Sequence, residues 1–136
     1  MLKEAKLALR VTASAYDAEI ASLLMAGAND LTIAGVVLPG TVSFTVNNDV
    51  ITDVSTLKDP LCQRAIFTYA AMRFGNPPNY DKLKEAYDTQ KVQLMHATGY
   101  TNYGEETTEP EAEEPETEPE AEEPETEPVT TEGDGE

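Results

Sequence analysis

The chain has 136 residues and a formal net charge of −17, which is divided very unevenly along its length. Residues 1–104 carry nine Lys/Arg against ten Asp/Glu, whereas residues 105–136 carry sixteen acidic residues and no basic one. The nearly neutral N-terminal part lacks the basic stripe of a nucleic-acid reader, so we expect no sequence-specific nucleic-acid binding. Because no run of about 18 apolar residues occurs, we also expect no membrane span.

The acidic C-terminal part is a low-complexity segment with a nine-residue repeat. Thr108–Glu116 reads TEPEAEEPE, Thr117–Glu125 repeats it without change, and a third copy begins at Thr126. A segment without aromatic residues and with almost no branched apolar side chains cannot bury enough surface to offset the entropy of ordering. Repulsion between Glu side chains and the regular Pro residues favour extended conformations. We therefore predict one folded domain over residues 1–104 and a disordered acidic tail over residues 105–136.

Apolar periodicity predicts two helices in the first third of the chain. The first spans Met1–Leu9. The second is expected to begin at Ser14, because Ser14 and Asp17 have the spacing of a capping box and Asp17 favours the positive first turn. Its apolar residues recur at helical spacing and predict a core-facing stripe. This stripe consists of Ile20, Leu23, Leu24, Gly27, Ala28 and Leu31.

The period changes from helical to alternating between Gly35 and Val54. Val42, Phe44 and Val46 alternate with polar residues and precede the turn-forming sequence Asn-Asn-Asp at 47–49. A second arm over residues 50–54 would complete a β-hairpin inserted between helices.

Two further helices are predicted after residue 58. Asp59 and Pro60 suit the N-cap and first position of a helix, and Gly75 suits its end. The inner face of this helix is expected to hold Leu61, Ala65, Ile66, Tyr69 and Met72. After the break at Asn76-Pro77-Pro78, the last helix begins at Asn79 or Asp81 and ends at Gly99. Its apolar stripe is expected to hold Leu83, Tyr87 and Leu94.

The predicted fold class is therefore mainly α, a small bundle of about four helices with a β-hairpin insertion and a disordered acidic tail. Cys62 and His96 are the single residues of their kinds, and their separation gives no metal-ligand spacing. We interpret Cys62 as a small core residue and His96 as a surface residue of the last helical turn. We predict no catalytic residue, no cofactor and no metal site.

The order and spacing of motifs in the C-terminal half resemble those of a known family. Residues 59–100 read DPLCQRAIFTYAAMRFGNPPNYDKLKEAYDTQKVQLMHATGY. The DPL helix start, the RAIFTY core, the FGN turn and the final helix with its YDKLKEAYDTQKVQL pattern resemble the head-tail connector (adaptor, head-completion) proteins of tailed bacteriophages. The opening LKEAKLALRVTASAYDAEIASLL is also similar to the start of that family.

The resemblance implies a non-enzymatic structural virion protein that forms a ring beneath the portal, extends the DNA channel and provides the tail docking site. The implied partners are identical copies, the portal protein, and tail or stopper (head-closure) proteins, at the head–tail interface of the virion and, during assembly, in the host cytoplasm. In such rings, loops and termini make the outside contacts. On that basis the candidate assembly interface is Phe44 and Val46 of the hairpin together with Tyr100 and Tyr103 after the last helix.

Two other readings stay open at this level. The helical domain could be a free protein-binding module whose acidic tail mimics DNA or engages a basic partner. A small enzyme that uses Cys62 as a nucleophile is the other, but no Gly-rich or oxyanion-forming element accompanies this residue.

Overall fold

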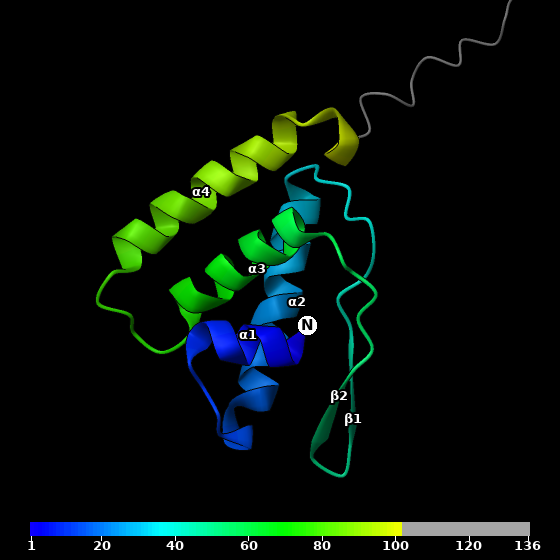
Figure 1. The fold of residues 1–136 in the computed structure, drawn as a ribbon, viewed down its shortest axis with the longest axis vertical. Helices are drawn as coiled ribbons and strands as arrows, with labels where there is room; N and C mark the ends of the chain where they lie inside the picture. Colours follow the sequence, from blue (N-terminus) through cyan, green and yellow to red (C-terminus); the bar gives the residue numbers. More distant parts are fainter. Residues whose placement is uncertain (102–136) are drawn as a thin grey trace, which may run out of the picture.

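The computed structural model describes residues 1–101 and consists mainly of helices with one small hairpin (Figure 1). The helices are α1 (Leu2–Leu9), α2 (Asp17–Ile33), α3 (Pro60–Arg73) and α4 (Tyr80–His96). Strands β1 (Phe44–Asn47) and β2 (Val50–Asp53) lie between α2 and α3, and two short 3-10 turns are η1 (Ser14–Tyr16) and η2 (Thr98–Tyr100). The predicted fold class of the domain is confirmed, while the predicted tail lies outside the described residues.

Helix α3 is the centre of the domain, because it packs against α2 on one side and α4 on the other, with α1 lying across α2 and α3 (Figure 1). The predicted stripe of α2 forms much of the core, and Leu23 alone among its residues is only partly buried. Loop residues Val36 and Leu57 close the core on the hairpin side. The largest fully buried side chains are Ile20, Leu24, Leu31, Leu57, Ile66, Val36 and Cys62.

The second helix begins later than predicted, and the predicted capping box does not form. Ser14 opens the 3-10 turn η1, α2 begins at Asp17, and neither element has a side-chain cap. Ser14 is exposed, whereas the Asp17 carboxylate forms an ion pair with Lys6 of α1. Asp17 therefore links α2 to α1 through an ion pair instead of taking part in a helix cap.

The β-hairpin is confirmed, with a two-residue turn. Phe44 pairs with Asp53, Val46 with Ile51, and the turn residues Asn48 and Asp49 have φ angles of 48° and 65°. Positive φ at both central positions is typical of the tight turns whose twist matches a hairpin, and Asn and Asp tolerate this conformation better than other non-Gly residues.

Helix α3 begins and ends as predicted, and of its predicted inner face Ala65, Ile66 and Met72 are buried and Tyr69 is partly buried. The Asp59 carboxylate accepts a hydrogen bond from the Cys62 backbone N–H at 2.9 Å, and Gly75 has a φ of 64° after the helix end. Leu61 was expected to be buried, which is wrong, since it is 57% exposed while Cys62 is fully buried. Cys62 precedes Ala65 and Ile66 by three and four residues, whereas Leu61 precedes them by four and five, so Cys62 lies nearer the centre of the core stripe.

Helix α4 begins at Tyr80, and it ends at His96, before the Gly99 stop that the sequence suggested. Ala97 is already extended, with φ −81° and ψ 122°, and turns the chain into η2. Tyr87 and Leu94 are buried as predicted. Asp30 of α2 accepts hydrogen bonds from the Tyr87 hydroxyl at 2.6 Å and from Lys91 Nζ at 2.7 Å, so a shared carboxylate fastens α4 to α2.

Candidate assembly interface

The base of the hairpin is fixed to the helical domain. Phe44 is half-buried and packs against the core, and its cross-strand partner Asp53 accepts a hydrogen bond from the Leu2 backbone N–H at 2.7 Å. Burial alone would raise the pKa of Asp53, but hydrogen bonds from the Met1 amino group, Ser55 and Leu2 outweigh it and lower the pKa. A carboxylate held by several donors keeps its charge and anchors β2 beside α1.

The outer half of the hairpin extends beyond this anchor. Val46 is 63% exposed, and because cross-strand partners point to the same face, its side chain lies on the same side as that of Ile51. Ile51 borders a groove of about 520 Å³ between α1 and β2. Leu7, on the other wall of this groove, is 80% exposed. We call Leu7, Val11, Val46 and Ile51 the hairpin–α1 surface.

Sequence reasoning found Val46 but missed Leu7. A signal was present, since Leu7 falls outside the stripe of Leu2, Ala5 and Leu9, and an apolar residue off the core-facing stripe of an amphipathic helix is exposed. Ile33, at the end of α2, was also missed and is 86% exposed. Large apolar side chains at such exposure are candidates for contacts with other proteins when they gather on one face, as Leu7 and its neighbours do.

Tyr100 contacts the chain itself. Its hydroxyl donates a hydrogen bond to Asp59 Oδ2 at 2.7 Å, and its carbonyl accepts one from the Val37 backbone N–H at 2.7 Å. The hydrogen bond to the Asp59 carboxylate raises the pKa of Tyr100 to about 12. The ring is half-buried, so only part of it is available to a partner. Tyr103 lies outside the described residues.

The two predicted interface elements lie at opposite ends of the domain. Figure 1 shows the hairpin turn at one end and η2 at the other. The tip of the hairpin and the η2 end of the domain are therefore separate candidate contact surfaces. The interface role of all four residues stays a prediction, and the arrangement divides it into two separate surfaces.

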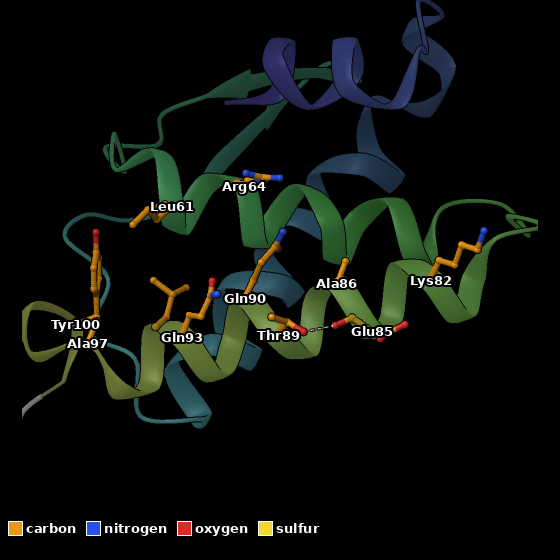
Figure 2. A pocket seen from close by; sticks show the side chains of 11 residues that line it. Leu61, Arg64, Lys82, Glu85, Ala86, Thr89, Gln90, Gln93, Ala97 and Tyr100 are labelled. Carbon is orange, nitrogen blue, oxygen red and sulfur yellow. Dashed lines mark hydrogen bonds between the residues drawn. The ribbon is translucent and has the colours of Figure 1, made fainter.

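A second groove, of about 730 Å³, lies between α3 and α4 and ends at Tyr100 (Figure 2). Its apolar lining consists of Leu61, Ala86, Leu94 and Ala97. In Figure 2 the side chain of Gln90 points from α4 toward α3, and that of Lys82 points toward the connection between the two helices. Its charged and polar lining consists of Arg64, Lys82, Glu85, Thr89, Gln90 and Gln93.

The single cysteine and the single histidine lie in different surroundings. Cys62 is fully buried, and burial together with the neighbouring Asp59 carboxylate raises the pKa of its thiol to about 12. This confirms the core assignment and disfavours the thiolate that nucleophilic catalysis requires. His96 is exposed on the last turn of α4, as predicted. Within residues 1–101, acidic, His and Cys side chains form no group of three that could hold a metal ion.

These features define a class of protein, a small helical subunit with an exposed apolar hairpin and grooves on two sides. Residues 1–101 match the family described as phage connector protein, and the chain belongs to this family. It is thus a structural virion protein of the head–tail connector type. Comparisons with curated proteins and with solved structures gave no match. No helix in the described part of the chain is both long and apolar enough to cross a membrane.

Proposed function

We propose that this connector protein forms a ring beneath the portal at the head–tail interface, extends the DNA channel and offers the docking site for tail or stopper proteins. In this proposal the protein acts by assembly and catalyses no reaction. Membership of the connector family supports this function. The contact surface that we assign to it rests on one observation, the strong exposure of the apolar side chains of Leu7 and Val46.

The hairpin–α1 surface is suited to contact a neighbouring protein because it combines a fixed base with exposed apolar tips. Asp53 holds β2 to the backbone of α1, so Val46 is presented on a strand whose position is defined. A side chain of this kind buried against a partner contributes about 1.5–3 kcal/mol, and a ring repeats each contact in every subunit. The opposite end, at Tyr100, is left for a different partner, so one subunit can contact two proteins.

The direct experiment is negative-stain electron microscopy of the full chain, alone and mixed with the portal protein of the same phage. We expect closed rings, either alone or stacked on the portal. A chain that stays monomeric and ignores the portal at high concentration would contradict the ring. Salt-sensitive binding to a basic protein that disappears with residues 105–136 would then favour the free binding module.

A double variant, Leu7→Gln with Val46→Thr, tests the contact surface. Gln is a good helix former and Thr a good strand former, so both elements should persist while their apolar tips are lost. We expect the affinity between subunits in ring formation to fall at least tenfold, with little change in the urea unfolding midpoint. The matched control is Val92→Gln, an exposed apolar residue of α4 away from the hairpin (51% exposed), which should assemble normally.

A further inference from the structure

The groove between α3 and α4 carries cations that the domain itself does not neutralise. Arg64 and Lys82 both line it, and within residues 1–101 neither forms an ion pair, whereas Lys84 on the same helix pairs with Asp88 and Lys91 with Asp30. Glu85 also lines the groove, which leaves its lining with one net positive charge. The groove is therefore suited to an acidic ligand of modest affinity.

The polar side chains of the groove suit an extended backbone. Gln90 Oε1 is buried and accepts no hydrogen bond from any described residue, which leaves an acceptor in need of a donor. Gln93 and Thr89 lie along the same wall. An extended or polyproline-like segment has free backbone N–H and C=O groups for such side chains, and its Pro and Ala residues can cover an apolar lining.

The chain supplies such a segment at the end of this groove. Tyr100 closes the groove and is held there by Asp59, so the chain leaves the described domain beside the groove at Thr101. Residues 105–116 follow within a few residues and read EETTEPEAEEPE, with seven acidic side chains and no basic one. From Lys82 to Ala97 the wall of α4 is about 22 Å long, which about seven residues span when extended.

We propose that the α3–α4 groove binds the acidic segment 105–116 of the same chain, with its carboxylates on Arg64 and Lys82. This inference goes beyond the connector function and does not depend on ring formation. Tethering compensates for weak contacts, because a short linker holds the segment at an effective concentration in the millimolar range. The groove would then be covered until a competing partner displaces the segment.

Carbodiimide cross-linking of the full chain, read by mass spectrometry, tests this assignment because it joins Lys amines to carboxylates in direct contact. We expect Lys82 to cross-link to residues 105–116 at least fivefold more often than the exposed Lys3 and Lys58. The preference should disappear in about 1 M salt, where the Debye length falls to about 3 Å. It should also disappear in Arg64→Glu, which leaves Lys82 in place, but not in the control Lys58→Glu.

Either of two results would overturn binding of the segment in this groove. One is equal cross-linking of all exposed lysines, and the other is a Lys82 preference that survives Arg64→Glu. A mixture of chains labelled with heavy and ordinary nitrogen identifies the source of the segment. Cross-links within one isotope are expected, whereas abundant mixed cross-links would assign the groove to the tail of a neighbouring copy and contradict binding within the chain.

Discussion

One carboxylate, that of Asp59, holds both the start of α3 and the end of the described chain. Its Oδ1 accepts the Cys62 backbone N–H at 2.9 Å, and its Oδ2 accepts the Tyr100 hydroxyl at 2.7 Å. The hydrogen bond from the Cys62 backbone, followed by that from Tyr100, lowers the pKa of Asp59 despite partial burial. The end of the described chain is therefore positioned by the same residue that caps the central helix.

Substitutions at Asp59 should separate its two roles. Asp59→Ala removes both acceptors, and we expect the free energy of unfolding to fall by about 1–2 kcal/mol, as for other lost N-caps. Asp59→Asn keeps a good cap and should cost clearly less. Urea unfolding at neutral pH measures the difference, and an equal loss in both variants would show that the cap contributes little.

Tyr100→Phe isolates the second role of Asp59. It keeps the ring against the groove but removes the donor to the carboxylate, so the cap on α3 persists while the C-terminal turn loses its anchor. We expect the amides of η2 to exchange with solvent faster, measured by hydrogen exchange, while amides at the start of α3 are unchanged. Faster exchange throughout α3 would contradict the separation of the two contacts.

Local signals predicted most of the fold because they depend on neighbours in the sequence. The Asp59-Pro60 start, the Gly75 end, the stripe of α2 and the hairpin all follow from spacing and backbone preference. The errors at Ser14 and Leu61 have a different cause. Asp17 is taken by Lys6 of another helix, and the orientation of α3 is set by packing against α2 and α4 together. Such tertiary contacts have no local signature.

The residues of the candidate interface likewise divide into those that local patterns predict and those that depend on tertiary contacts. Val46 was found from strand alternation, and Leu7 could have been found as a residue off its stripe. In contrast, the groove between α3 and α4 is lined by residues of two helices, and the Asp59–Tyr100 contact joins residues 41 positions apart. No periodic pattern predicts them, because they depend on how the helices cross and where the chain turns after Ala97.

The stability of the protein should depend on alkaline pH through Tyr87. Burial and the hydrogen bond to Asp30 raise the pKa of Tyr87 above its ordinary value of 10.0. Because the pKa is higher in the folded than in the unfolded state, the stabilisation by Tyr87 is complete below about pH 10 and is lost as the pH rises. Between the pKa values of the unfolded and the folded state, the free energy of unfolding falls by about 1.4 kcal/mol for each pH unit. Base should therefore unfold the protein through this residue.

Tyr87→Phe tests this dependence. At pH 7 the variant should be less stable by about 1–2 kcal/mol, because it lacks a charge-assisted hydrogen bond. Above pH 10 the gap between the two proteins should narrow, since only the wild-type chain must keep Tyr87 protonated. Urea unfolding midpoints of the wild-type chain and the variant, measured from pH 7 to above pH 10, test this expectation. The exposed Tyr80→Phe is the control, and a gap that stays constant for Tyr87→Phe would contradict the argument.

Gly40 fixes the loop that carries the hairpin to the core. Its φ is 150°, and a Cβ at this position would lie 2.7 Å from backbone atoms of Leu57 and 2.9 Å from the carbonyl carbon of Thr56. Backbone cannot yield as a side chain can, so we expect Gly40→Ala to lower the free energy of unfolding by at least about 2 kcal/mol. Gly99→Ala has no atom within 4 Å of its Cβ and should change stability by less than about 0.5 kcal/mol. Similar urea midpoints for the two variants would contradict this account.

Cys62 should be unreactive until the domain opens. Its thiol is fully buried with a pKa near 12, whereas the unfolded chain has an accessible thiol with a pKa near 9.0. Because only the thiolate attacks a disulfide reagent, labelling at pH 8 should be slow in the folded protein and rapid in urea. The rate should increase in Asp59→Ala about tenfold for each 1.4 kcal/mol of stability that the variant loses, as expected when reaction requires opening. Rapid labelling of the native chain would contradict the core assignment, and full assembly by Cys62→Ala would eliminate a nucleophilic role.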